Sequence, residues 1–213
     1  GSARAGLAYV KIGPGGQVSL IIDRFKPMNA QAGIETRPFI RDLYVLTGAS
    51  LCGGSAFALL RRFYEDAAEM MGLTIPDETA IYEAMVSSAG AVEAGADGLI
   101  ADTRFDGARH NPSQLASLNG LSRGNFTPAH LNRAVLEGIA NELAQFYEAI
   151  LAQHGAANTL AGSGNALRRN ELLQSIVSRR FGFLLGMPAW PAEAAVGGGG
   201  LGAGQSTNPN GSH

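Results

Sequence analysis

The sequence predicts a single α/β domain with a mixed sheet flanked by helices, and three patterns lead to this expectation. Two β-branched runs, residues 8–12 and 17–23, are separated by a glycine-rich connection, which is typical of a hairpin. Short apolar runs twice lead into a glycine turn and then into an amphipathic helix. A long amphipathic helix lies between these two units. Strands and helices in this order indicate a mixed sheet that is covered by helices.

Length and composition set the class of protein. The chain has 213 residues, of which 46% are hydrophobic and 16% charged, and a formal net charge of −2. This near-neutral balance gives no reason to expect a nucleic-acid or membrane partner, and no apolar run is long enough to span a bilayer. A single cysteine, Cys52, allows no internal disulfide. We therefore expect a globular protein in a reducing, cytoplasmic setting.

The connection in the first hairpin reads Gly13-Pro14-Gly15-Gly16. Successive backbone N–H groups in a glycine-rich turn can form a concave anion site, although Pro14 removes one of these donors. The turn is therefore either a plain hairpin tip or a contact for phosphate.

The run from residue 43 to residue 47 predicts a third strand, which leads into a glycine turn and a helix that begins after Gly54 and ends at Gly72. We expect the buried face of this helix to contain Phe57, Leu60, Tyr64, Ala67, Ala68 and Met71. Pro76 and Asp77 open a second helix, whose buried stripe is expected to be Ile81, Tyr82, Met85 and Val86.

The longest helix is predicted over residues 130–153. Thr127 is placed as its N-cap, Pro128 as its first residue, and Gly155 ends it. Its apolar stripe consists of Leu131, Val135, Ile139, Leu143, Phe146 and Ile150.

A short apolar run at residue 160 enters the turn Gly162-Ser163-Gly164, and a helix that closes at Phe181 follows. Glycines allow a backbone to approach a flat or phosphorylated ligand closely, and a helix start offers unpaired N–H groups. An ordinary tight turn is the alternative reading of this pattern.

Two segments carry a resemblance to a known family. Ala116–Leu121, a gap of eight residues, and then His130–Glu137 resemble the second signature of the FGGY carbohydrate kinases. Further segments agree in the same order, so that the resemblance runs from Tyr9 to Gly200. They are Gly13–Gly15, similar to a phosphate loop; Gly53–Ser55, similar to a nucleotide-contacting turn; Gly162–Asn165, similar to the adenosine loop; and Glu193–Gly197, similar to the closing helix. Residues 48–54 and 103–109 are most similar to sedoheptulokinases.

The resemblance implies a ribonuclease-H-like fold of the actin and hexokinase type, in which two domains close on a nucleotide. Residues 3–202 would be the C-terminal nucleotide-binding domain, and residues 203–213 a disordered tail. The implied cofactors are ATP and Mg²⁺. Carried over residue by residue, the predicted contacts are Gly13 and Gly15 with the β- and γ-phosphates, Gly54 with the α-phosphate or ribose, and Gly162, Gly164, Asn165 and Asn170 with the adenosine.

The chain departs from the family pattern in two places. Pro14 stands where the family usually has a threonine whose hydroxyl can donate to a phosphate. The Gly-Asp-Gln or Gly-Asp-Asn motif that carries the general base does not occur in the chain. We therefore assign no catalytic residue. His110 has no second histidine or cysteine at ligand spacing, and we assign no metal ligand either.

These expectations combine into one leading function and one alternative. The leading function is the ATP-binding half of a sugar kinase, which transfers the γ-phosphate of ATP to a hydroxyl of a sedoheptulose-like or ketose-like sugar and is inactive as this chain alone. Its partners would be the nucleotide, the sugar and a missing N-terminal kinase domain, and an exposed inter-domain face would allow self-association into a homo-oligomer. The alternative is a non-catalytic nucleotide-binding or protein-interaction module derived from such a kinase.

Overall fold

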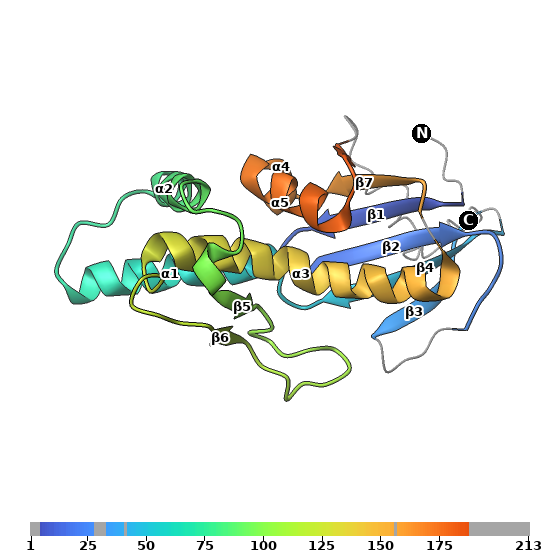
Figure 1. Ribbon diagram of the computed structural model, residues 1–213, viewed down its shortest axis with the longest axis horizontal. Coiled ribbons are helices and arrows are strands. Elements are labelled where there is room, and N and C mark those ends of the chain that lie inside the picture. The colour runs from blue at the N-terminus through green and yellow to red at the C-terminus, as the bar shows by residue number, and fades with distance from the viewer. Residues whose placement is uncertain (1–4, 28–32, 41, 156, 188–213) are drawn as a thin grey trace, which may run out of the picture.

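The computed structural model describes residues 5–27, 33–40, 42–155 and 157–187. A six-stranded sheet in the order β3-β4-β2-β1-β7-β8 forms its centre, and β5 and β6 form a separate two-stranded sheet (Figure 1). The strands are β1 (Leu7–Ile12), β2 (Gly16–Ile22), β3 (Ile34–Pro38), β4 (Tyr44–Ser50), β5 (Ile100–Asp102), β6 (Ser117–Asn119), β7 (Thr159–Ser163) and β8 (Leu185–Gly186).

The sheet is mixed, as predicted. β1 and β2 form the predicted antiparallel hairpin, with Ile12 opposite Gly16, and β4 and β3 continue the antiparallel order on one side. On the other side β7 runs parallel to β1, with Lys11 beside Ser163, and β8 runs parallel to β7. Parallel neighbours end at the same edge of a sheet, so β1 and β7 deliver the segments that follow them to one place.

The helices are α1 (Gly54–Met70), α2 (Glu78–Gly90), α3 (Pro128–His154), α4 (Asn165–Arg168) and α5 (Glu171–Phe181), and a short 3₁₀ helix covers Ala96–Gly98. Helix α3 confirms the long helix that was predicted over residues 130–153. Thr127 caps it by accepting a hydrogen bond from the N–H of His130, Pro128 opens it, and Gly155 follows its last residue.

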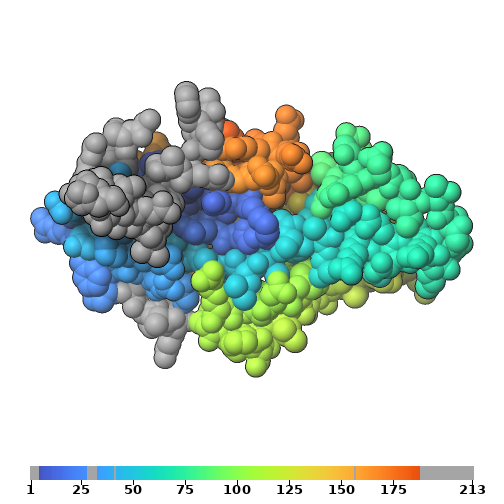
Figure 2. All heavy atoms as spheres, turned by 180° about the vertical axis from the view of Figure 1, so that it is seen from behind, coloured from blue at the N-terminus to red at the C-terminus, as the bar shows by residue number. Residues whose placement is uncertain are grey.

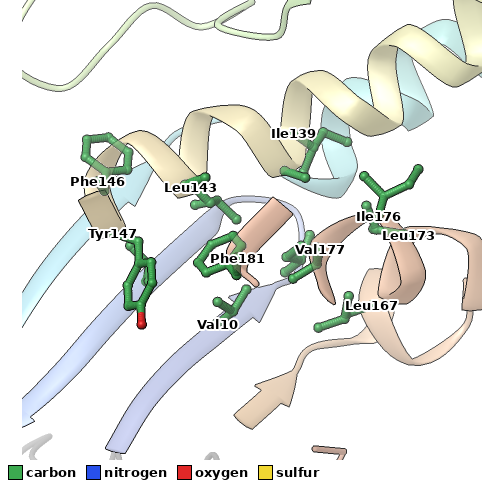
Figure 3. Packing of buried hydrophobic residues seen from close by; sticks show 14 of the residues in the cluster. Val10, Ile139, Leu143, Phe146, Tyr147, Leu167, Leu173, Ile176, Val177 and Phe181 are labelled. Carbon is green, nitrogen blue, oxygen red and sulfur yellow. The ribbon is translucent and has the colours of Figure 1, made fainter. Parts of the chain in front are cut away.

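Helices α3 and α5 pack on one face of the sheet and form the hydrophobic core with it (Figure 3). Val10 of β1 is fully buried there together with Leu143 of α3 and Val177 of α5. Tyr147 and Phe181 bring the two helices together, with ring centroids 5.1 Å apart. Buried aliphatic and aromatic side chains at this crossing supply the main stabilising term of the domain.

Helix α1 leaves the sheet beside α3, and α2, seen nearly end-on in Figure 1, packs against α3. Asp77 caps α2 through the N–H of Ala80. The prediction that Met71 packs with the buried face of α1 is wrong, because Met71 follows the last residue of the helix and its side chain is 61% exposed.

Two further predictions, the closing helix at Glu193–Gly197 and the tail at residues 203–213, lie outside the described residues. Within the residues that the structure describes, none of the helices is long and apolar enough to cross a membrane.

Candidate functional site

Three glycine turns meet at the edge of the sheet where β1 and β7 end. The turn after β4 contacts the tip of the first hairpin directly: the N–H of Gly53 donates to the carbonyl of Pro14, and the N–H of Gly54 donates to the carbonyl of Gly13, both at 2.7 Å. The turn after β7 passes over the end of β1, where Gly164 lies against Ile12. Three segments that are far apart in the sequence, residues 13–16, residues 50–54 and Gly164, therefore form one continuous edge, which we call the glycine rim.

Gly54 lies between the hairpin tip and α4. A Cβ atom on this residue would stand 2.7 Å from the Cβ of Ala166 and 2.8 Å from the carbonyl oxygen of Gly13. Both distances are shorter than real Cβ contacts, so the close approach of these three segments requires glycine here. The N–H group of Gly54 already donates to the carbonyl of Gly13. Gly54 therefore contributes to this rim by leaving room for its neighbours, because it has no side chain.

Glycine is required at position 164 both by the backbone conformation and by the atoms that surround it. Its φ is 92°, in the left-handed region, and a Cβ atom would lie 2.2 Å from the carbonyl oxygen of Ile12. This conformation directs the chain from β7 into α4, which begins at Asn165.

A cavity of about 650 Å³ opens beside this rim, between α1 and α3 on one side and α2, α4 and α5 on the others. Seen from behind, α2 (green) and the α4–α5 segment (orange) stand as separate lobes on either side of a hollow above α1 (Figure 2). Both apolar and polar residues line it: Gly54, Phe57, Glu78, Thr79, Tyr82, Glu83, Val86, Ser87, Leu136, Ile139, Asn165, Ala166, Arg169, Asn170 and Leu173.

Three of the predicted site residues line this cavity: Gly54, Asn165 and Asn170. Asn170 is buried, and its Oδ1 atom accepts a hydrogen bond from the N–H of Leu173 at 2.9 Å, which caps α5. Among the described residues nothing accepts a hydrogen bond from its Nδ2 atom, which can therefore donate to a ligand. Asn165 is exposed at the first position of α4.

The other predicted residues lie around the cavity without lining it. The N–H of Gly13 donates to the carbonyl of Gly15 at 3.0 Å, whereas the N–H of Gly15 has no partner within the described ranges. Gly15 is therefore the better donor of the two at the hairpin tip. Gly162 belongs to β7 and not to the turn that the sequence predicted; it is buried beneath Leu167 and Leu185 and takes part in the packing of that strand.

The wall formed by α2 was missed as a site by sequence reasoning. Tyr82 and Val86 were predicted to be buried core residues; they are half-buried and pack against the core, and they also line the cavity. The guanidinium of Arg61 lies 5.4 Å from the centre of the Tyr82 ring, and Phe57 stacks against the same ring at 6.1 Å. No local sequence signal marks these positions, because an apolar stripe on a helix fits a core and a cavity wall equally well.

A polar cluster is buried directly behind the rim. Ser50 at the end of β4 and Glu142 of α3 are hydrogen-bonded at 2.8 Å, and both are more than nine-tenths buried. Burial raises the pKa of Glu142, while the hydrogen bond from Ser50 and the charge of Arg104 oppose this shift. Burial also raises the pKa of the Cys52 thiol, as does its hydrogen bond to Asp106, so this thiol is a poor nucleophile at neutral pH.

Comparison with known proteins identifies the family. Residues 18–204 match the family model described as the FGGY family of carbohydrate kinases, C-terminal domain. The chain is 30% identical over 144 residues to human sedoheptulokinase and 31% identical over 146 residues to the mouse enzyme; each match covers 68% of this chain. The chain spans only 30% of the length of these two curated relatives.

Solved structures of sugar kinases share the fold. Xylulose kinase from Bifidobacterium adolescentis superposes on 91% of this chain and 35% of its own with a TM-score of 0.74 and 18% identity. Xylulose kinase from Rhodospirillum rubrum covers 91% of this chain and 37% of its own (TM-score 0.71, 24% identity), and Plasmodium falciparum glycerol kinase with ADP covers 87% and 36% (TM-score 0.68, 20% identity). The predicted ribonuclease-H-like fold of the actin and hexokinase type is thereby confirmed. The chain belongs to the FGGY family of carbohydrate kinases and corresponds to its C-terminal domain.

Proposed function

We propose that this chain is the ATP-binding half of a sugar kinase that transfers the γ-phosphate of ATP to a sugar hydroxyl, with the nucleotide bound in the cavity between α1, α2 and α5. The observation that carries the proposal is the junction of this cavity with the glycine rim. A cavity of about 650 Å³ is in the range of small-ligand sites, and it has an apolar wall with a few polar groups, as such sites do.

The residues present fit ATP. The purine and ribose would lie in the cavity, where Asn170 offers a donor and Phe57 and Val86 offer apolar contact. The triphosphate would pass Gly54, where a side chain would block the way, and reach the hairpin tip, where Gly15 offers an N–H group. We retain Gly13, Gly162, Gly164 and Asn165 as proposed members of this site, with Gly162 acting on the packing of β7 and Gly164 on the shape of the turn that follows it.

Mg²⁺ is the second proposed cofactor. The described part of the chain contains no group of three or more histidine, cysteine or carboxylate side chains suited to a metal. Mg²⁺ commonly binds through substrate phosphates and keeps several waters. We therefore propose that it reaches this domain with the nucleotide, where it supplies charge neutralisation between the β- and γ-phosphates.

The remaining parts of the proposal concern the whole kinase. The curated relatives are sedoheptulokinases, which supports a sedoheptulose-like or other ketose substrate. We propose that residues 3–202 form the domain, that an N-terminal kinase domain is its partner, and that the general base belongs to that partner, because the base motif of the family does not occur in these 213 residues. The cytoplasmic setting stays a prediction that follows from the single cysteine.

Exposed apolar side chains support a covered inter-domain face. They occur on β5 and β6 and on the segments that adjoin these strands: Ile100, Phe105, Leu115, Leu118, Leu121 and Phe126, each more than two-fifths exposed. Large exposed apolar side chains in one region favour a partner surface. In the absence of the partner domain, the same face would support a homo-oligomer.

Calorimetric titration of the 213-residue chain with Mg-ATP, Mg-ADP and AMP tests the proposal. We expect ATP to bind more tightly than AMP in a magnesium-dependent way. Ser87 lines the cavity on α2, whereas Ala84 is exposed on the same helix and does not line it. Ser87→Phe should weaken ATP binding about tenfold or more by filling the cavity, and the matched control Ala84→Phe should change it less than about twofold.

The same titration distinguishes the proposed function from the alternative function. Pro14 at the hairpin tip is the observation that favours a non-catalytic module, since it removes both an N–H group and the usual hydroxyl. A chain that gives no heat with any of the three nucleotides would support the module and overturn the nucleotide site. Sugar-dependent release of ADP by this chain alone would show that the general base had been assigned to the wrong part of the kinase.

A further inference from the structure

Glu142 occupies an unusual place for a carboxylate. It lies on α3 where this helix crosses β2 and β4: the next residue, Leu143, packs against Gly16, and Phe146 packs against Gly48. The Glu142 side chain is 7% exposed, and its Oε2 atom lies 2.8 Å from the Ser50 hydroxyl and 3.5 Å from the Thr103 hydroxyl. A buried carboxylate costs stability unless hydrogen bonds or a partner charge compensate for its loss of water.

Ser50 connects Glu142 to the backbone of the turn that follows β4. Its Oγ atom accepts a hydrogen bond from the N–H of Cys52 at 3.1 Å and lies 3.0 Å from the carbonyl oxygen of the same residue. The hydroxyl has one proton and two lone pairs. If Glu142 is neutral, it can donate to Ser50, and Ser50 can donate to the carbonyl of Cys52, so that all three contacts are satisfied at once. If Glu142 is ionised, Ser50 must choose between the carboxylate and the carbonyl.

The turn held by Ser50 is the one that touches the hairpin tip. Directly after Cys52, the N–H groups of Gly53 and Ser55 both donate to the carbonyl of Pro14, at 2.7 and 3.0 Å. Gly54 donates to Gly13 in the same way. A hydrogen-bonded path therefore runs from Glu142 through Ser50 to the backbone that faces the proposed phosphates.

The surroundings of Glu142 are suited to this role. The described charged groups that act on it are Arg104 and Asp102, which are paired with each other. Burial raises the pKa of Glu142, whereas the hydrogen bond from Ser50 and the charge of Arg104 lower it, and the net shift is upward.

We propose that Glu142 is a positioning residue which, through Ser50, fixes the turn at residues 50–54 against the hairpin tip and thereby sets the affinity of the domain for the outer phosphates of its nucleotide. This inference rests on the proposed function for the identity of the ligand. It assigns Glu142 no contact with the nucleotide, so its removal should affect ATP and leave the binding of AMP nearly unchanged.

The test compares four variants of the 213-residue chain by calorimetry with Mg-ATP and with AMP. Loss of one buried hydrogen bond at the rim should lower ATP affinity about tenfold in Glu142→Ala and in Ser50→Ala, with AMP affinity changed less than about twofold. Glu142→Gln keeps a donor for Ser50 and should restore ATP affinity to within about threefold of wild type. The control, Glu148→Ala, removes a carboxylate from the exposed side of α3 and should change neither affinity.

Wild-type affinity for ATP in both Glu142→Ala and Ser50→Ala would overturn the inference, as would an equal loss for ATP and AMP, which a general loss of structure would cause. Should Glu142→Ala fail to fold, Ser50→Ala, which removes a single oxygen atom, decides the outcome. Amide hydrogen exchange gives a readout without nucleotide: the N–H groups of Gly53 and Gly54 should exchange about tenfold faster in the variants. A wild-type chain that binds no ATP would refute the proposed function, and unchanged exchange at these two amides would refute the positioning role separately.

Discussion

A methyl group added at Gly54 tests the geometry of the rim most sharply. In Gly54→Ala the new Cβ atom would lie 2.7 Å from the Cβ of Ala166 and 2.8 Å from the carbonyl oxygen of Gly13. Neither neighbour is the mobile end of a long side chain, because one belongs to α4 and the other to the backbone of the hairpin tip. The change therefore forces the two segments apart.

The magnitude follows from these distances. Restoring ordinary contact requires shifts of about 0.7 Å at Ala166 and about 0.6 Å at Gly13, and overpacking of this kind costs about 1 to 3 kcal/mol. Alanine returns less than about 1 kcal/mol through its higher helix propensity at the start of α1. We expect a net loss of about 1 to 2 kcal/mol in the free energy of unfolding and a loss of about tenfold in ATP affinity, because the hairpin tip moves away from the cavity.

Urea denaturation and calorimetry measure the two effects. The matched control is Gly90→Ala, at the last residue of α2, where a Cβ atom would have no neighbour within 4 Å. This control should leave ATP binding unchanged and stability unchanged or slightly raised. Wild-type stability together with wild-type ATP affinity in Gly54→Ala would show that close packing at Gly54 is not required.

Three further predictions concern a pKa, a helix cap and the hairpin tip. The pKa of Glu142 is raised in the folded state, so its proton stabilises the fold below the ordinary value of 4.5, and this stabilisation is lost as the pH rises through the raised pKa. In urea denaturation, the free energy of unfolding of Glu142→Gln minus that of wild type should therefore be higher at about pH 8 than at about pH 4. An equal difference at the two pH values would contradict this. Asn170→Ala removes the cap of α5 and should cost about 1 kcal/mol in the same assay, whereas Asn170→Asp, which keeps the acceptor for Leu173, should cost clearly less. Pro14→Thr restores an N–H group and a hydroxyl at the hairpin tip and should strengthen the binding of ATP more than that of AMP in calorimetry; an equal change for both would place residue 14 away from the phosphates.

The elements with strong local signals were predictable from the sequence. The first hairpin follows from its β-branched runs and its glycine connection, and α3 follows from Thr127, Pro128 and a long apolar stripe. The glycines after the strands and at the hairpin tip were recognisable as turn residues. The structure adds the reason that glycine is needed at Gly54 and Gly164, which is the closeness of backbone from another segment.

Features that depend on distant contacts were not predictable. The edge strand β3 was missed because only Ile34 is buried among its five residues, so that it carries no clear alternation. Glu142 was overlooked because a single carboxylate on an amphipathic helix is expected to face water, whereas α3 is covered on nearly every side. The wall of the cavity formed by α2 depends on how far this helix stands from α4 and α5, which no local pattern encodes.

The central claim is that a nucleotide lies in the cavity beside the glycine rim, and mapping of amide NMR shifts on addition of Mg-ATP tests it most directly. We expect the largest shifts at Gly15, Gly54, Asn165 and Asn170. Little change is expected at a second cavity, which Leu7 and Gly182 help to line. Shifts that gather at that second cavity, or that spread thinly over the surface while the rim stays unchanged, would contradict it.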